Sequence, residues 1–236
     1  MNTMNTGRIE RIVKEALSIG RKVLVEPEAK EVLRLASFPV PRSKAVKDVA
    51  GAIDAAREIG FPVALKLISP DIIHKSDAGG VFLNIMDEKE IEEKWSRIIL
   101  GIADDYPTAL IEGFLVEEMV KKGAEVIIGC VRDEQFGPAV MFGIGGVTVE
   151  LMKDVSFRLA PITREEAFEM MGEVKGFPIL TGYRGQTVKD LDAIADALIK
   201  LGDIVGRVEG IKELEINPLI VHERGAVVAD ARAVLR

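Results

Sequence analysis

The polar residues with the clearest spacing lie near the carboxyl terminus, in residues 214–219. Because alternate residues of a strand point to opposite faces, Glu215 and Asn217 would share one face, with apolar neighbours on the other. A turn after residue 222 would bring Asp230 opposite this polar face. Carboxylate and amide oxygens gathered in this way suit Mg²⁺, which prefers oxygen ligands and keeps phosphate and water in its shell. A solvent-facing hairpin is the alternative.

A lysine stands in the middle of an apolar segment. Residues 63–68 have the apolar density of a buried strand, and Lys66 lies inside it. An unpaired ammonium is costly to bury, so Lys66 needs either a carboxylate or an anionic ligand. A lysine on a partly exposed strand is the alternative.

The polar loop that follows, residues 69–80, carries His74 and ends in two glycines. Gly79 and Gly80 allow the backbone to approach a ligand closely and to turn its N–H groups toward phosphate oxygens. A neutral imidazole is also a nucleophile near pH 7. A plain turn would have a similar composition, so the loop alone does not decide between the two interpretations.

An acidic segment joins the two halves of the chain. Glu117, Glu118, Met119 and Val120 could form a strand-like hinge whose main chain binds an adenine edge, while Glu125 binds ribose hydroxyls. Acidic residues that are merely solvated on an exposed strand are the alternative. The two commonest nucleotide fingerprints are missing, since residues 143–146 lack the final glycine of a dinucleotide motif and no P-loop is present.

Composition excludes several classes of protein. The 236 residues include one cysteine and two histidines, so neither a disulfide framework nor a His/Cys zinc site can form, and any metal must be bound by oxygen. A net charge of −7 and 5% aromatic residues argue against a nucleic-acid surface. No membrane-length apolar segment and no secretory signal are present, which predicts a cytoplasmic protein that does not bind membranes. Scarce Asn and Gln hint at a heat-adapted source.

The elements that must position these residues form a mixed α+β plan, with a subdomain change expected between about residues 106 and 117. Apolar periodicity and turn residues predict helices and strands in alternation over the first half, and mostly short strands after residue 109. The predicted helices are 5–19, one ending before 38–41, 50–59, 88–103, 164–171 and 188–208; the predicted strands are 63–68, 81–85, 114–120, 124–131, 139–142, 147–151, 155–160, 212–221 and 226–231.

A resemblance to a known family is carried by several segments together. They are Lys66 and residues 74–81, 131–138, 142–146, 154–161 and 215–219, and the similarity runs from about Lys22 to the end. These segments resemble the ATP-grasp β subunit of ADP-forming acetyl-CoA synthetases. Residues 78–81 and 215–219 also resemble the β subunit of succinyl-CoA ligases.

The resemblance implies an enzyme that converts acyl-CoA, ADP and phosphate reversibly into acid, CoA and ATP. It implies an ATP-grasp fold in which nucleotide lies between two α+β subdomains. We expect a helical extension at residues 1–21, an N-terminal subdomain at 22–112 and a C-terminal subdomain at 113–236. The implied nucleotide-binding residues are Lys66, Gly79, Gly80, the hinge residues Glu117, Glu118, Met119 and Val120, and Glu125, with Asn217 and Asp230 as ligands of Mg²⁺.

A phosphohistidine relay is also implied by the resemblance. A histidine of a partner α subunit takes phosphate from an acyl phosphate, and His74 occupies the position of the β-subunit histidine that passes it to ADP. Glu215 could orient the imidazole, and Arg158 could neutralise the transferring phosphate. His222, beside a predicted turn, is expected to be a bystander.

The chain shows no CoA-binding Rossmann unit and no second catalytic histidine in a helix-flanked loop, both of which the α subunit supplies in the resembled enzymes. We therefore expect a complex with an α subunit, of the form α₂β₂. Two alternatives stay open: a succinyl-CoA-ligase-like β subunit, and a regulatory module that binds ATP without turnover.

Overall fold

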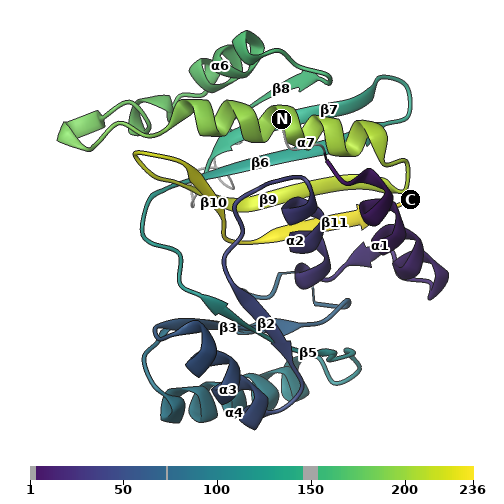
Figure 1. Cartoon of the computed structure of the whole chain (residues 1–236), viewed down its shortest axis with the longest axis vertical. Coiled ribbons are helices and arrows are strands. Elements are labelled where there is room, and N and C mark those ends of the chain that lie inside the picture. Colours follow the sequence, from purple (N-terminus) through teal and green to yellow (C-terminus); the bar gives the residue numbers. More distant parts are fainter. Residues whose placement is uncertain (1–3, 73, 146–153) are drawn as a thin grey trace. The chain divides into compact units, whose positions relative to one another are not determined.

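The computed structural model describes residues 4–72, 74–145 and 154–236, which form two compact units (Figure 1). The small unit is Pro41–Val120, and the large unit combines the residues up to Val40 with those from Lys121 onward. Both units contain helices and antiparallel strands, so the α+β prediction is confirmed. Among the described residues, none of the helices has the length and apolar character needed to span a membrane.

The small unit is a four-stranded sheet with two helices. Its strands are ordered β2-β5-β3-β4, and its helices α3 and α4 begin where Asp48 and Asp87 accept main-chain N–H groups. Its apolar core includes Leu65 and Phe114, whose ring centroid lies 3.8 Å from that of Trp95. The bounds are β2 Ser43–Val46, α3 Val49–Ile59, β3 Val63–Ile68, β4 Val81–Ile85, α4 Glu88–Asp105 and β5 Gly113–Glu118.

The large unit is built on a longer sheet, ordered β1-β11-β9-β6-β7-β8, with β10 paired to β9. Its strands are β1 Val23–Leu24, β6 Ala124–Asp133, β7 Gly137–Ile144, β8 Val155–Leu159, β9 Ile211–Val221, β10 Ala226–Val228 and β11 Ala231–Leu235. Its helices are α1 Thr6–Ser18, α2 Glu26–Leu35, α6 Arg164–Glu173 and α7 Leu191–Arg207, with short 3₁₀ turns at Phe177–Ile179 and Tyr183–Gly185.

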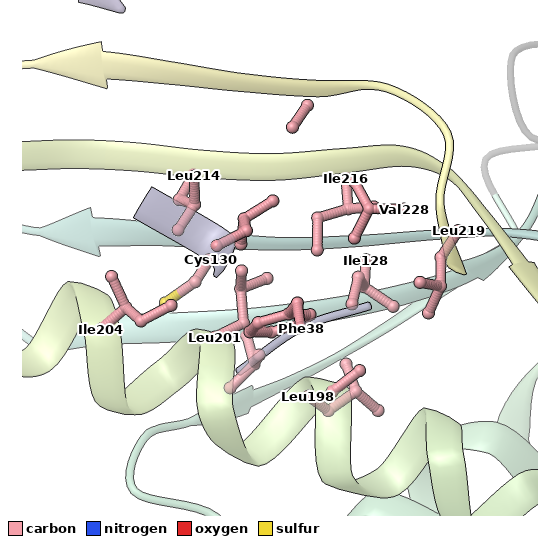
Figure 2. Packing of buried hydrophobic residues seen from close by; sticks show 14 of the residues in the cluster. Phe38, Ile128, Cys130, Leu198, Leu201, Ile204, Leu214, Ile216, Leu219 and Val228 are labelled. Atoms are coloured by element: carbon pink, nitrogen blue, oxygen red, sulfur yellow. The ribbon is translucent and has the colours of Figure 1, made fainter. Parts of the chain in front are cut away.

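The core of the large unit lies between α7 and one face of this sheet. Figure 2 shows Leu201 and Ile204 of α7 on the side of Cys130 of β6, with Leu214 of β9 above it, all of them buried. Helix α7 is amphipathic, with apolar residues recurring every three or four positions, so it presents one continuous apolar stripe to the sheet. This packing fixes which face of β9 is left for polar residues.

The boundaries between the units differ from those predicted. Val23 of β1 pairs with Val234 of β11, so the segment before residue 40 belongs to the large unit rather than to the range 22–112. Strand β5 lies between β2 and β3, so the chain leaves the small unit after β5 rather than before it. Both pairings join residues distant in sequence, which local patterns do not reveal.

Most predicted elements are present, with small shifts at their ends. Strands β1 and β2 were not predicted, since they are only two and four residues long, and the last predicted strand is divided into β10 and β11. The predicted strand at 147–151 lies outside the described residues.

Candidate functional site

Lys66 and Glu117 form a buried ion pair within the sheet of the small unit. Lys66 is in register with Leu115 of β5, which places Glu117, two residues further, on the same face. The Lys66 Nζ lies 2.8 Å from Glu117 Oε1, and the two side chains are 7% and 3% exposed. Of the two partners that the sequence allowed for Lys66, the structure contains the carboxylate.

The loop between β3 and β4 is fastened where it begins. Ser69 Oγ accepts hydrogen bonds from the N–H groups of Asp71 and Ile72, at 3.2 and 3.3 Å, and the Ile72 side chain is buried. Asp71 Oδ2 accepts a hydrogen bond from Leu110 N–H at 2.7 Å. His74 follows this anchor two residues later and is exposed.

The same loop is fastened where it ends, at the two glycines. Gly80 N–H donates to Lys75 O at 2.7 Å, and Leu67 N–H donates to Gly80 O at 2.8 Å. A Cβ at Gly80 would lie only 3.1 Å from Lys75 O, and Gly79 has a φ of +69°, so each position favours glycine for its own reason. His74 is therefore exposed between two anchored ends of the loop.

The hinge residues divide into two pairs. Glu117 and Glu118 lie inside β5, where Glu118 N–H donates to Arg42 O at 2.9 Å. The Glu118 carboxylate accepts a hydrogen bond from Arg42 Nε at 3.0 Å, which lowers the pKa of Glu118. Met119 and Val120 follow the end of the strand. The Glu118 N–H is thus engaged within the small unit, while the expectation that the hinge residues 117–120 offer main-chain N–H and C=O groups to a base stays a prediction.

Glu215 and Asn217 of the large unit, which together with Asp230 are here called the oxygen cluster, lie on the strand face that the two-residue period predicted. Leu214 and Ile216 are buried, while Glu215 is half-buried and Asn217 exposed on the other face of β9. Asn217 N–H donates to Asp230 O at 3.1 Å, so the two residues lie side by side on neighbouring segments. The Asp230 carboxylate is oriented by its own neighbour, because Oδ1 accepts the Ala231 N–H at 2.7 Å.

The chemistry of these donors fits Mg²⁺. An amide oxygen and a carboxylate are hard oxygen ligands, and Mg²⁺ is commonly bound by one or two protein carboxylates with phosphate and water completing its shell. Across residues 4–72, 74–145 and 154–236, no group of three or more His, Cys, Asp or Glu side chains is placed to hold a metal ion. With Asn217 and Asp230 as protein ligands, phosphate and water would complete the shell of a cation held here.

Glu125 is exposed at the start of β6, and a glycine packs closely against its main chain. Gly145 N–H donates to Glu125 O at 2.7 Å, and a Cβ at Gly145 would lie 2.9 Å from the Glu125 carbonyl carbon. The sequence did not predict a role for Gly145, because residues 143–146 do not match the common nucleotide-binding motifs. The signal that could have identified it is the cluster of glycines at 143–146, which marks close contact between backbones.

Arg158 is not brought to this cluster. It is in register with Val140, Cys130 and Leu214 across β7, β6 and β9, so it lies on the face that the helices cover, opposite to Glu215. Three strand spacings separate β8 from β9, about 14 Å. Its guanidinium binds Glu173 of α6 instead, with Nη1 3.1 Å from Oε2, and this contact raises the pKa of Arg158.

The chain is similar to known proteins over almost its whole length. The model of the ATP-grasp domain family matches residues 15–235. The chain is 46% identical to the β subunit of acetate–CoA ligase [ADP-forming] I from Pyrococcus furiosus, over 97% of this chain and 98% of the relative. It is 28% identical to the β subunit of an ADP-forming succinate–CoA ligase from Halorubrum lacusprofundi, over 88% of this chain and 54% of that subunit.

The chain is also similar to part of a longer enzyme and to an enzyme of known structure. Acetate–CoA ligase [ADP-forming] I from Archaeoglobus fulgidus is 45% identical over 97% of this chain, which corresponds to only 33% of the relative. Acetyl-coenzyme A synthetase 1 from Ca. Korarchaeum cryptofilum, described as dinucleotide forming, superposes with a TM-score of 0.93 and 46% identity over 96% of this chain and 99% of its own. In another structure of that enzyme, with coenzyme A and Mg-AMPPCP, a phosphohistidine segment points towards the nucleotide binding site.

Proposed function

This chain belongs to the ATP-grasp family and, within it, to the β subunits of ADP-forming acetate–CoA ligases; from that premise we propose how its residues serve the reaction of acyl-CoA, ADP and phosphate to acid, CoA and ATP. The supporting observation is 46% identity over nearly the whole of both chains, so the likeness is not confined to a nucleotide-binding segment. The much lower identity to the succinate–CoA ligase subunit favours this assignment over the succinyl-CoA alternative.

The small unit supplies contacts to the nucleotide phosphates and base. Lys66 offers a fixed ammonium, held in place by Glu117. Gly79 and Gly80 leave room for a phosphate to approach the main chain, but the expectation that their N–H groups bind it is corrected, because Gly79 N–H donates to Ser76 O at 3.1 Å and Gly80 N–H to Lys75 O at 2.7 Å. Met119 and Val120 offer main-chain groups to adenine, since they follow the regular part of β5. These assignments are supported by the geometry of each segment and by the family's use of nucleotide.

His74 is the phosphoryl carrier. Phosphate first displaces CoA from the acyl thioester, and a histidine of the partner takes the phosphoryl group from the acyl phosphate, which releases the acid. A ring nitrogen of His74 then attacks the phosphorus and the bond to the first histidine breaks. An oxygen of the ADP β-phosphate finally displaces His74, which yields ATP and the free imidazole. The exposed position of His74 between two loop anchors supports this role.

Asn217 and Asp230 hold Mg²⁺, and Glu125 binds the ribose. Bound Mg²⁺ neutralises phosphate charge as the phosphoryl group moves. Glu215, next to Asn217 on the same strand, is our candidate for accepting an imidazole N–H and so orienting the ring. The predicted role of Arg158 is not supported by its position, because its guanidinium is engaged by Glu173 on the opposite face.

An α partner supplies the CoA and acyl sites. The subunit names of the Pyrococcus relatives and the longer Archaeoglobus relative, of which this chain matches a third, both imply such a partner. We propose an α₂β₂ assembly, and a cytoplasmic location because ATP and CoA are found there.

Labelling with phosphate tests the relay directly. The full chain, purified with its α partner, is incubated with Mg-[γ-³²P]ATP and the protein-bound phosphate is tested for acid lability and base stability. We expect His74→Asn to abolish this label and acyl-CoA-dependent ATP synthesis. His222→Asn is the matched control, and it should retain both.

Retention of acid-labile label by the His74→Asn chain would show that another residue carries phosphate. Loss of label in the His222→Asn control, with the protein still folded, would equally contradict the assignment.

A further inference from the structure

A second buried ion pair lies in the large unit, and the reaction described above does not use it. Lys30 and Glu26 are one turn apart on α2, with Lys30 Nζ 2.8 Å from Glu26 Oε1 and the side chains 0% and 2% exposed. The same ammonium donates to Ala229 O at 2.8 Å. Ala229 directly precedes Asp230. We propose that this pair positions Asp230 for metal binding, an inference that rests on the Mg²⁺ site proposed above.

Folding alone does not explain charges at this place. The neighbouring residues of α2 that face the core are apolar and fully buried, among them Ala29, Val32 and Leu33. Buried ion pairs give up hydration, and apolar residues of similar volume commonly serve stability equally well or better. The pair therefore points to a requirement for the second contact of Lys30, the one to Ala229 O.

That contact acts on Asp230 through the planarity of the peptide group. The Ala229 carbonyl and the Asp230 N–H belong to one rigid unit, so holding the oxygen fixes the plane that precedes the Asp230 Cα. Ala229 N–H donates to Pro218 O at 3.0 Å, and Asn217 N–H donates to Asp230 O at 3.1 Å. The segment between β10 and β11 is thus held at successive peptides, and Lys30 adds a contact that comes from a helix.

Glu26 orients the ammonium of Lys30. It lies in the first turn of α2, where the helix dipole favours a carboxylate, and its Oε1 lies 2.8 Å from Lys30 Nζ. Outer residues that orient ligands commonly change metal affinity 10–100-fold when they are removed. The structure thus assigns Glu26 and Lys30 as positioning residues.

The test replaces the pair without leaving an unpaired charge. In the full chain, Glu26→Leu/Lys30→Met removes both charges, and Mn²⁺ binding at fixed ADP is measured by electron paramagnetic resonance. We expect Mn²⁺ affinity to fall about tenfold, with the urea midpoint of unfolding nearly unchanged. With the α partner, the Mg²⁺ concentration for half-maximal rate should rise while kcat recovers at high Mg²⁺.

Two variants separate positioning from a general effect. Glu26→Gln keeps the contact from Lys30 to Ala229 O and should keep most of the Mn²⁺ affinity. Glu31→Gln/Arg34→Gln removes an exposed pair of the same helix and should change nothing. If the Leu/Met chain does not fold, Glu26→Gln/Lys30→Gln, which keeps neutral polar groups, is measured in its place with the same expected loss.

Asp230→Asn distinguishes this inference from the proposed function. If Asp230→Asn weakens Mn²⁺ binding and the double variant stays within twofold of the parent, the positioning role is overturned and the metal site stands. If Asp230→Asn leaves the Mn²⁺ affinity unchanged, the assigned metal ligand is wrong and the inference fails with it.

Discussion

At the residue scale, Lys66 has a structural partner in Glu117 and a proposed second partner in the nucleotide phosphates. The ion pair with Glu117 explains how the charge of Lys66 is tolerated inside β3. It does not explain why this position of the strand carries a lysine rather than an apolar residue. An apolar pair would serve the sheet as well. Replacing both charges by apolar side chains separates the structural role from the proposed binding role. The sheet keeps a packed pair, whereas the contact from the ammonium to phosphate is lost.

We expect Lys66→Met to lower the free energy of unfolding by about 3–5 kcal/mol, because it leaves the Glu117 carboxylate buried without its ammonium. Lys66→Met/Glu117→Leu should recover most of this loss. ADP affinity should stay at least about tenfold reduced in both, since the proposed charge-assisted contact to phosphate is missing. Urea titration and calorimetry with ADP measure the two quantities.

Lys44→Met is the matched control, because the pair of Lys44 with Glu58 is exposed and its loss should hardly change either measurement. Recovery of ADP affinity together with stability in the double variant would mean that Lys66 serves folding alone.

Some positions in the candidate site could be predicted from the sequence and others could not, because the first depend on local periodicity and the second on contacts between distant segments. The period of a strand is local, so the shared face of Glu215 and Asn217 and the position of Asp230 followed from spacing. The partner of Arg158 did not, because Glu173 lies fifteen residues away on a helix whose packing depends on the whole core. For the same reason the engagement of Glu118 by Arg42, 76 residues away, was not foreseen.

At the element scale, Asp190 joins the start of α7 to the hairpin that carries the oxygen cluster. Its Oδ1 accepts Ala193 N–H at 3.0 Å as a helix N-cap, and its Oδ2 accepts Gly225 N–H at 2.6 Å in the turn between β9 and β10. Both donors stabilise the ionised carboxylate and lower the pKa of Asp190. Helix α7 and the hairpin are therefore fastened by one side chain.

Asp190→Ala should lower the free energy of unfolding by about 1–2 kcal/mol, through loss of the N-cap and of the turn contact. Because the pKa is lower in the folded protein, this contribution is present at neutral pH and is lost as pH falls below about 4. Circular dichroism at 222 nm during urea titration, at pH 7 and near pH 3, measures it. A difference between parent and variant that is equally large at both pH values would contradict this account.

Element boundaries were predictable where a cap or a long period marked them. The helix predicted at 50–59 begins at the cap that its sequence supplies, Asp48, and the amphipathic period of α7 predicted a helix close to its true extent. Strands β1 and β2 are too short to show a period, and β1 exists only because β11 is beside it.

At the scale of the whole molecule, the small unit is an insertion between two segments of the large one. Each unit has its own apolar cluster, and the cluster of the small unit is the less extensive. The chain also carries one native reporter for each: the only tryptophan, Trp95, lies in the small unit, and the only cysteine, Cys130, lies in the core of the large unit. Burial raises the pKa of Cys130 to about 12, so its thiol should react only after that core opens.

We expect urea unfolding followed by Trp95 fluorescence to have a lower midpoint than unfolding followed by labelling of Cys130, because the smaller core buries less apolar surface. Cys130→Ser, which removes the labelling signal, is the control for the second probe. Coincident midpoints and slopes for both probes would instead show a single cooperative transition.

The pairing of β1 with β11 has a consequence for synthesis on the ribosome. The small unit is complete once residue 120 has emerged, and it has all the strands of its sheet by then. Strand β1, although made first, finds its partner only when residues 233–234 leave the exit tunnel. Helix α2 likewise gains the acceptor of Lys30 only at residue 229. The earliest part of the chain is thus among the last to reach its native contacts, and the order of translation is not the order of folding.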